Sequence, residues 1–301
     1  MSRPLPAPTV PFLPDVGIAH AVWAEVATET DARQTVEQLR DWNPDWVVVD
    51  SYAFGSEWHD AVRHGLGCRI GAIDDLADRN MSVDLLVDHN YAPDHRAKYR
   101  TRLSGAALLL GGPSYALLGP EYADAPRYGP REDVLSIGLF MGGVDQGDIS
   151  PIVLEAIERA GFTGPVEVVT TSANPHLEKL KARAAYRSDT RLSVDLDHLA
   201  GFFARHDLQI GAGGGATWER CCIGAPTLLL MIADNQRAVV PELAAQGIVA
   251  TVQPLDALDA EAIAVGISDL LSNPARRAQL AERSRGLVDG RGASRVAEAM
   301  T

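Results

Sequence analysis

The sequence has few cysteines and no long apolar run. It contains three cysteines among 301 residues, and two of them, Cys221 and Cys222, are adjacent. An odd number with this spacing argues against a disulfide framework and against a structural zinc site. No apolar stretch reaches the length of a membrane span, and the first 14 residues lack the basic and apolar regions of a secretory signal. We therefore expect a cytoplasmic protein without stable membrane insertion.

Positive charge is also scarce. The chain has 27 Lys and Arg against 40 Asp and Glu, which gives a net charge of −13. Such an acidic surface repels nucleic acid and anionic lipid, so neither is expected as a main partner. An anionic ligand would have to be held by helix N-termini and backbone N–H groups, because the overall field opposes it.

Two common catalytic motifs are missing as well. There is no G-x-S-x-G, so a serine nucleophile of the α/β-hydrolase kind has no support, and there is no H-E-x-x-H. The histidines are scattered, and His59 and His64 are expected on a helix that faces solvent. The sequence predicts no metal site and no cofactor.

What is present is an alternation of strand and helix patterns. Trp46–Asp50 (WVVVD) is a continuous β-branched run typical of a buried parallel strand, and Val166–Thr170 and Leu208–Gly211 are further expected strands. This alternation predicts an α/β fold with two Rossmann-like, doubly wound domains. The other expected strands are Arg69–Asp74, Asp84–Asp88, Ala107–Leu110, Val134–Met141, Arg191–Val194 and Thr227–Ile232; the expected helices include Thr30–Asp41, Ser56–Gly65, Asp197–Arg205, Thr217–Ile223, Gln236–Gln246 and the segment from Asp259.

Glycine and proline punctuate this pattern at places that predict boundaries and caps. The segment Gly111–Pro130 holds four glycines and four prolines, which predicts a hinge between domains 1–125 and 126–301. Ser150 and Asn174 are each followed by proline, and both are expected to cap helices. Pro241 is expected to bend the helix Gln236–Gln246. A ligand would lie in a cleft between the domains, outside the carboxyl ends of the strands.

The strongest local motif is the turn after Leu208–Gly211. Glycines at 211, 213, 214 and 215 allow close backbone approach, and the helix that follows presents free N–H groups and a positive dipole end. This geometry suits a phosphate; the alternative is a tight turn without a ligand. Glu219, one turn into the helix, could accept hydrogen bonds from ribose hydroxyls, or it could simply be a favourable charge near a helix N-terminus.

Four further polar or glycine-rich turns are candidates. Gly142-Gly143 follows another expected strand and could face the same ligand. Asn235 has the pattern of an N-cap, although Asn235 and Gln236 could also bind sugar hydroxyls or acetamido groups. In the first half, Asp50-Ser51-Tyr52 and Asp74-Asp75 follow strands, so their carboxylates could do acid–base work or serve as caps and turn residues.

Taken together, these motifs resemble a known family. The matching segments are PDWVVVDSY (44–52), AIDDLADR (72–79), DLLVDHNY (84–91), LLGGPSYALLGPEY (109–122), MGGVD (141–145), IGAGGGATWERCCIGAPTLLL (210–230), ADNQ (233–236) and LVDGRGASR (287–295). They are similar to the UDP-2,4-diacetamido-2,4,6-trideoxy-β-L-altropyranose hydrolases of pseudaminic acid synthesis, which are grouped with spore-coat polysaccharide proteins. The resemblance implies a glycosyltransferase-B-like fold and metal-independent release of UDP from a UDP-sugar, with water as the acceptor.

The resemblance also implies roles for individual residues. Glu219 would contact the ribose. Tyr52 and Asn235 would line the sugar pocket, with Gln236 beside them. The diphosphate would be held by Gly142, Gly143, Gly213, Gly214, Gly215, Ala216 and Thr217.

The chain departs from this family at its beginning. The family opens with a strand and a Gly-x-Gly-His turn whose histidine is thought to be catalytic. Here His20, in Val16–His20, lacks the second glycine and the preceding strand. We therefore expect a first domain that is truncated at its N-terminus, with no assigned catalytic residue. The alternatives are a glycosyltransferase of the same fold and a non-catalytic nucleotide-sugar-binding protein.

Overall fold

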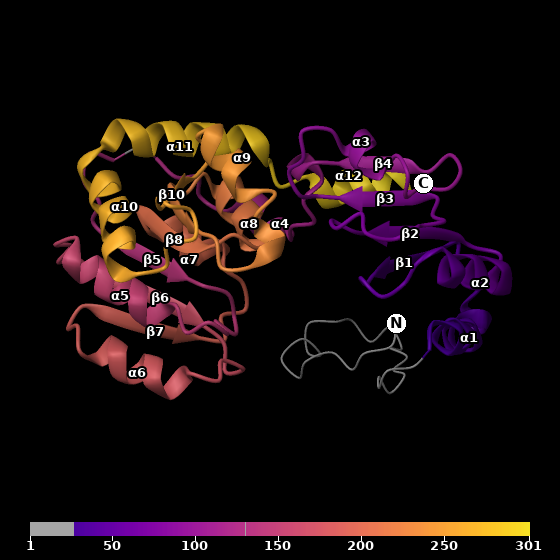
Figure 1. The fold of residues 1–301 in the computed structure, drawn as a ribbon, viewed down its shortest axis with the longest axis horizontal. Coiled ribbons are helices and arrows are strands. Elements are labelled where there is room, and N and C mark those ends of the chain that lie inside the picture. Colours follow the sequence, from indigo (N-terminus) through magenta and orange to yellow (C-terminus); the bar gives the residue numbers. More distant parts are fainter. Residues whose placement is uncertain (1–26, 130) are drawn as a thin grey trace. The chain divides into compact units, whose positions relative to one another are not determined.

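The computed structural model describes residues 27–129 and 131–301, which form two compact units (Figure 1). The first unit takes the described residues up to Tyr115 together with Val296–Thr301, and the second takes Ala116–Arg295. The division at Tyr115 lies inside the glycine- and proline-rich segment Gly111–Pro130. The last six residues belong to the first unit, whereas a single division at residue 125 assigns them to the second. His20 lies outside the described residues.

The sheet of the first unit is parallel throughout. Its strands are β1 (Trp46–Asp50), β2 (Arg69–Ile73), β3 (Leu85–Asp88) and β4 (Leu108–Gly111), paired in that order. The four strands expected from the sequence are therefore confirmed to within about one residue. One detail was wrong: among the described residues β1 is an edge strand, and Val48 is 49% exposed, so this strand is not buried on both faces.

Helices cover both faces of this sheet. The helical segments are α1 (Thr28–Leu39), η2 (Arg40–Trp42), α2 (Ser56–Leu66), α3 (His95–Tyr99), η3 (Pro113–Tyr115) and the end of α12 (Gly292–Ala299). Alternate residues of β3 face opposite ways: Leu86 packs with the cluster that includes α1 and α2, whereas Leu85 and Val87 pack with Val296 and Met300. This alternation makes the unit doubly wound, as predicted.

The ends of these first helices differ from the expectation. Helix α1 begins at Thr28, two residues before the expected start at Thr30, and no side chain caps it. Helix α2 ends at Gly67, whose φ of 68° is in the left-handed region, and not at Gly65. Gly65 lies inside the helix. A Cβ at this position would lie 2.6 Å from Val36 Cγ2, so the residue must be glycine for the two helices to pack this closely. A close helix–helix contact, and not a helix stop, accounts for this glycine.

His59 is buried, so the expectation that it faces solvent was wrong. It is 1% exposed on the inner face of α2, and its Nδ1 accepts a hydrogen bond of 3.3 Å from the backbone N–H of Ser82. Burial, with the positive charges of Arg79 and Arg63, lowers the pKa of His59 to about 4. His64, one turn later, is exposed.

We expect this buried imidazole to make the first unit less stable in mild acid. As the pH falls, the unfolded chain protonates His59 near its ordinary pKa of about 6.5, whereas the folded chain does so only near 4. The contribution to stability is complete above pH 6.5 and is lost as the pH falls to 4, by about 3 kcal/mol at most. His59→Asn keeps an acceptor for Ser82 and should flatten the fall in thermal midpoint between pH 7 and 4.5. His64→Asn is the matched control, and an unchanged pH profile in His59→Asn would contradict the assignment.

The second unit is built on a six-stranded parallel sheet. Its strands are β5 (Ile137–Phe140), β6 (Val166–Thr170), β7 (Thr190–Val194), β8 (Leu208–Ala212), β9 (Thr227–Leu230) and β10 (Ala250–Thr251), arranged in the order β10-β9-β8-β5-β6-β7. The first five were predicted. The two-residue strand β10 was missed, since so short a segment carries no period-two pattern.

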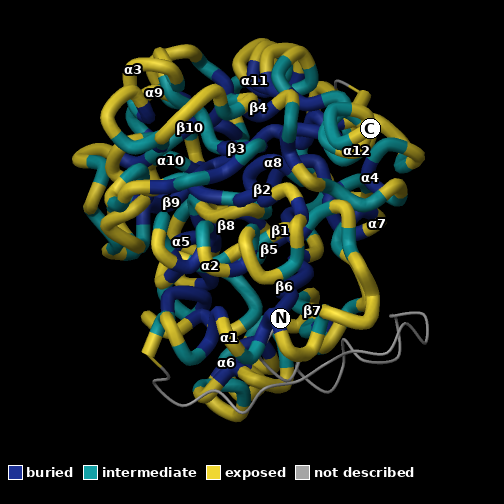
Figure 2. Tube along the Cα trace, turned by 90° about the vertical axis from the view of Figure 1, so that its right-hand side faces the viewer, coloured by how far each residue is buried: buried dark blue, intermediate teal, exposed yellow. Residues whose placement is uncertain are grey.

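Helices again cover both faces of the sheet. Leu208 and Ile210 belong to the core that includes α5 and α10, whereas Gln209 points the other way and donates to the carbonyl oxygens of Phe202 and Phe203 in α7. Figure 2 shows the strands of this sheet largely buried within more exposed helices and loops. The helical segments are α4 (Pro120–Asp124), α5 (Ser150–Arg159), α6 (Leu177–Ala185), α7 (Ala200–Arg205), α8 (Ala216–Ile223), η4 (Asp234–Gln236), α9 (Val240–Ala245), α10 (Ala260–Ser272) and α11 (Pro274–Leu287).

Four local predictions in this unit were wrong, one of them the expected cap at Asn174, because α6 begins after His176 and no side chain caps it. The expected helix Gln236–Gln246 is two elements, η4 and α9, and Pro241 stands in the first turn of α9, where its missing N–H costs nothing. Asn235 lies inside η4 and is not its N-cap. Ser150 is the first residue of α5, and the carboxylate of Asp145 caps that helix instead, accepting from the N–H groups of Ile149 and Ser150 at 3.0 and 2.9 Å.

Strand order in the second unit identifies a switch point. From β5 the chain proceeds outward through β6 and β7, and it then returns to place β8 on the other side of β5 and continues through β9 to β10. The connections after β5 and β8 therefore diverge to opposite sides of the sheet. In open α/β sheets ligands bind outside the carboxyl ends of the strands at such a point.

Candidate functional site

The two glycine turns predicted from the sequence are neighbours at this switch point. Strand β5 pairs with β8 so that Phe140 lies opposite Gly211. The turn after β5 begins at Met141, and the turn after β8 begins at Gly213. Both turns thus start from the carboxyl ends of adjacent strands, as the sequence indicated only indirectly.

The turn after β8 leaves backbone donors open. The N–H of Gly213 donates to Leu230 O at 3.2 Å, and the first turn of α8 closes with a hydrogen bond of 2.9 Å from the N–H of Thr217 to Gly214 O. Within residues 27–129 and 131–301, the N–H groups of Gly214, Gly215 and Ala216 have no hydrogen-bond acceptor. Three consecutive donors at the N-terminus of a helix form a ready site for an anion.

The glycines of this turn serve two different purposes. A Cβ at Gly213 would lie 2.8 Å from Val240 Cγ2 and 3.1 Å from Gln236 Oε1, so this position requires glycine for close packing. A Cβ at Gly214 or Gly215 would meet nothing within 4 Å, and Gly215 has an ordinary helical φ of −53°. Packing does not explain these two glycines. Their exposed backbone supports the anion-binding interpretation over the tight turn without a ligand.

In the turn after β5, more of the polar groups are already hydrogen-bonded within the protein. Gly142 needs its glycine because its φ is +93°. The carbonyl oxygen of Gly143 accepts from Thr171, whose N–H and Oγ1 lie at 3.0 and 2.8 Å. Since the carboxylate of Asp145 already occupies the N-terminus of α5, that helix end does not offer its first donors to a ligand. Of the two helix N-termini at the switch point, the one at α8 is available.

Glu219 sits where the sequence placed it, one turn into α8, and its carboxyl group forms a hydrogen bond with the hydroxyl of Tyr122. Burial raises the pKa of Glu219, and burial beside this carboxyl group raises the pKa of Tyr122. The buried atom Oε2 of Glu219 has no hydrogen-bond partner within the described part of the chain. A buried acceptor without a donor is suited to a ligand hydroxyl.

The other predicted residues of this unit differ in their exposure and in whether their polar atoms are already hydrogen-bonded within the protein. Ala216 begins α8, and Thr217 is buried, with its hydroxyl 3.4 Å from the guanidinium of Arg220. Asn235 is exposed and free to contact a ligand. Gln236 is buried, and its Oε1 accepts from the N–H of Ile232 at 2.8 Å, so that oxygen supports the turn after β9.

In the first unit the structure brings Tyr52 together with the predicted carboxylates. A cavity of about 160 Å³ is lined by Tyr52, Asp50, Ile73, Asp74, Asp75 and His89. The Tyr52 hydroxyl donates to Asp75 Oδ1 at 2.7 Å, and burial together with this hydrogen bond raises the pKa of Tyr52. The small polar cavity at these strand ends is compatible with part of a sugar.

The two adjacent carboxylates of this cavity have different surroundings. Asp74 is fully buried, bonds to the Arg79 guanidinium at 2.7 Å and accepts from the N–H of Ala77 at 3.0 Å. It is therefore a turn and ion-pair residue. Asp75 binds the Asn90 amide at 2.5 Å and lies in the cavity wall. Among the described residues no cluster of three or more His, Cys, Asp or Glu has the arrangement of a metal site.

Sequence reasoning missed two residues of the second unit. Tyr122, which bonds to Glu219, comes from α4, about 100 positions earlier in the chain. Arg220 is 1% exposed and reaches back to the end of β8, where its Nη2 donates to Ala212 O at 2.6 Å. No sequence pattern distinguishes a buried arginine from one on a solvated helix face, so only the structure could reveal it.

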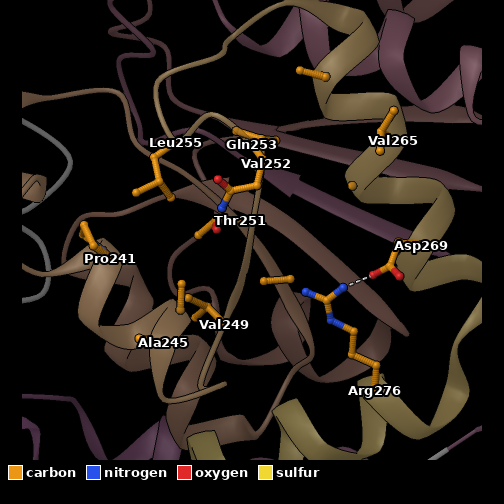
Figure 3. A pocket seen from close by; sticks show the side chains of 14 residues that line it. Pro241, Ala245, Val249, Thr251, Val252, Gln253, Leu255, Val265, Asp269 and Arg276 are labelled. Atoms are coloured by element: carbon orange, nitrogen blue, oxygen red, sulfur yellow. Dashed lines mark hydrogen bonds and ion pairs between the residues drawn. The ribbon is translucent and has the colours of Figure 1, made fainter.

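A hollow in the second unit has a different character from the Tyr52 cavity of the first unit. About 610 Å³ is enclosed mainly by small and apolar side chains of α9, β10 and α10, with the Arg276–Asp269 ion pair at one side (Figure 3). None of the predicted site residues lines it. No helix within the described ranges is both long and apolar enough to cross a membrane.

Several known proteins are similar in sequence to this chain. No family model matches the chain. It is 28% identical over 200 residues to the spore coat polysaccharide biosynthesis protein SpsG of Bacillus subtilis, covering 65% of this chain and 59% of that protein, and so spans less than two thirds of that relative's length. It is 23% identical over 201 residues to the UDP-2,4-diacetamido-2,4,6-trideoxy-β-L-altropyranose hydrolase of Campylobacter jejuni, covering 67% and 71%.

The fold is also found among solved structures. The crystal structure of Acinetobacter baumannii MurG superposes with a TM-score of 0.61 over 96% of this chain and 82% of that chain, at 13% identity. The expected glycosyltransferase-B-like fold is thereby confirmed. Together with the ordered sequence motifs, these matches show that the chain is similar to the spore coat protein SpsG and to the UDP-diacetamido-trideoxy-altropyranose hydrolase.

Proposed function

We propose that this chain binds a UDP-linked sugar and releases UDP from it. The observation that carries the proposal is the set of open N–H groups at Gly214, Gly215 and Ala216, with the unpartnered carboxyl oxygen of Glu219 one turn farther along α8. Together they provide donors for a diphosphate and an acceptor for a ribose hydroxyl. The names of the two relatives support a nucleotide-sugar substrate in polysaccharide biosynthesis.

Each unit is proposed to contact a different part of the substrate. The second unit holds the nucleotide, and the first, with Tyr52 and its cavity, contacts the sugar. In the hydrolysis, water attacks the anomeric carbon, the bond from that carbon to the UDP oxygen breaks, and UDP leaves. Backbone donors at the α8 N-terminus stabilise the negative charge that develops on the leaving diphosphate. Tyr52, Asn235 and Gln236 remain proposed sugar contacts, and the sugar proposed is a diacetamido-trideoxyhexose.

Binding and turnover assays separate this function from its alternatives. UDP binding is measured by calorimetry, and UDP release is assayed with UDP-diacetamido-trideoxyhexoses in water alone. Release that requires an added acceptor sugar or lipid would instead favour a glycosyltransferase. If UDP binds but no UDP is released from a UDP-sugar, with or without an acceptor, the protein is a non-catalytic nucleotide-sugar-binding protein. Absence of UDP binding would refute the proposal altogether.

The proposed ribose contact gives a sharper prediction. We expect Glu219→Ala to weaken UDP binding by about 10- to 30-fold, because the variant loses a charge-assisted hydrogen bond worth about 1.5–2 kcal/mol. Calorimetry with UDP, 2′-deoxy-UDP and 3′-deoxy-UDP completes the cycle. The unsubstituted protein should bind one of the deoxy ligands more weakly than it binds UDP. Glu219→Ala should bind that deoxy ligand and UDP with equal affinity.

Tyr122→Phe is the accompanying variant, because it removes the hydroxyl that bonds to Glu219 and leaves the carboxylate in place. We expect it to keep the preference for the intact ribose. If neither deoxy ligand distinguishes Glu219→Ala from the unsubstituted protein, Glu219 does not contact the ribose.

A further inference from the structure

The second unit contains a buried cation that forms no ion pair within 4 Å among the described residues, although Glu219 and Cys221 interact with it over a longer range. Arg220 is 1% exposed, and none of the ion pairs within 4 Å in the described ranges includes it. Its Nε and Nη1 have no acceptor among the described residues. Although burial lowers the pKa of Arg220 to about 10, the side chain remains positively charged at neutral pH. A buried charge without a close counterion is costly.

The other fully buried arginine of this unit also forms no ion pair among the described residues, and its Nε also lacks an acceptor there, but its terminal nitrogens are fully hydrogen-bonded. Arg277 is 0% exposed, and its two terminal nitrogens donate to four carbonyl oxygens, of Leu270, Leu271, Arg131 and Glu132. Arg220 makes one short hydrogen bond, 2.6 Å to Ala212 O, and a long one, 3.4 Å to Thr217 Oγ1. General packing needs therefore do not explain why a guanidinium occupies this position.

The position of the guanidinium relates it to the anion site. A Cβ at Gly211 would lie 2.3 Å from Arg220 Nη1 and 2.7 Å from Phe140 O, so the guanidinium lies against the ends of β8 and β5. Its Cζ is also 5.6 Å from the centre of the Phe203 ring, which helps to accommodate a buried cation. The guanidinium thus contacts Gly211 and Ala212, which precede the turn that carries the open donors of Gly214–Ala216.

We propose that Arg220 is a buried positioning residue whose positive charge stabilises a diphosphate bound at the N-terminus of α8. Arg220 acts without direct contact, by holding the carbonyl of Ala212 and so the start of the turn, and by adding a fixed charge in a region of low dielectric. The ligand in turn adds negative charge to that of Glu219, the acidic side chain that interacts with Arg220 in the free protein. The role of Arg220 rests on the proposed function, since the ligand is the UDP diphosphate.

The test compares Arg220→Met with the unsubstituted protein for ligands of increasing charge. Calorimetry is carried out with UMP, UDP and inorganic pyrophosphate. We expect the Kd of UDP to rise by about 10- to 100-fold and that of UMP by a smaller factor, because the electrostatic contribution grows with phosphate charge. Arg220→Lys, which keeps the charge, should lose less. Arg159→Met, on an exposed ion pair of α5, controls for the change in net charge.

Thermal unfolding separates this role from a purely structural one. Without ligand, Arg220→Met should keep or raise the midpoint of the unsubstituted protein, because the variant no longer buries a charge without a close counterion. With saturating UDP, the midpoint of the unsubstituted protein should rise more than that of the variant. A lower midpoint without ligand, together with equal losses for UMP and UDP, would identify Arg220 as merely structural.

The failure of this inference is distinguishable from that of the proposed function. Equal affinity of Arg220→Met and the unsubstituted protein for UDP would overturn the role of Arg220 and leave the nucleotide site intact. No binding of UDP or pyrophosphate by the unsubstituted protein would overturn both.

Discussion

Replacement of Gly215 by aspartate should abolish nucleotide binding while leaving the fold intact. A side chain at this position meets nothing within 4 Å, and its φ of −53° is accessible to any residue. A carboxylate in the first turn of a helix also interacts favourably with the helix dipole. The new carboxylate would occupy or repel the position of the diphosphate beside the open N–H groups. We expect the Kd of UDP to rise by at least about 100-fold, which is about 2.7 kcal/mol, with a thermal midpoint equal to or above that of the unsubstituted protein.

Two controls separate charge from shape. Gly215→Asn has nearly the same volume without the charge and should lose much less affinity. Gly286→Asp places the same charge on α11, at another glycine with no atom within 4 Å of its Cβ position, and should bind UDP normally. Should Gly215→Asp bind UDP as tightly as Gly215→Asn does, the α8 N-terminus is not the diphosphate site.

Replacement of Arg277 by methionine should destabilise the second unit strongly. The four carbonyl oxygens that Arg277 satisfies include those of Leu270 and Leu271 in the last turn of α10, where no helical N–H is available. Methionine fills similar space but donates nothing, so these oxygens would be left without partners at about 1 kcal/mol or more each. We expect a loss of about 3 kcal/mol or more in the free energy of unfolding, measured by urea titration.

Arg276 provides the matched comparison on the same helix. Its ion pair with Asp269 is well exposed, so Arg276→Met should change the free energy of unfolding by less than about 1 kcal/mol. Similar losses for Arg276→Met and Arg277→Met would show that the carbonyl contacts of Arg277 carry little stability.

Secondary structure was predictable wherever a single local pattern decided it. Trp46–Asp50 and Val166–Thr170 became strands with unchanged bounds, since short segments rich in β-branched residues are suited to a parallel sheet with helices on both faces. Helix caps were less predictable. Ser150, next to Pro151, had the expected pattern, yet Asp145, with its φ of +42°, supplies the cap from five residues earlier. A cap depends on the path of the preceding loop, which composition does not reveal.

The candidate site was predictable in its backbone and not in its supporting side chains. Consecutive glycines after a strand indicate an exposed turn whatever the rest of the chain does, so Gly214 and Gly215 could be found from the sequence. Tyr122 and Arg220 depend on tertiary packing: one approaches Glu219 from a distant helix, and the other turns inward from a position that the sequence pattern leaves ambiguous.

The return of the last six residues to the first unit limits how the molecule can be divided. Val296, Ala299 and Met300 pack on Leu85, Val87 and Leu110, and the indole N–H of Trp46 donates to Met300 O at 2.9 Å. The first unit is therefore not a single continuous stretch of polypeptide, whereas the second unit, Ala116–Arg295, is continuous. A fragment that ends at Tyr115 would expose an apolar sheet face that the native C-terminus covers, so expression of the first unit alone would need residues 296–301 supplied through a short engineered connection.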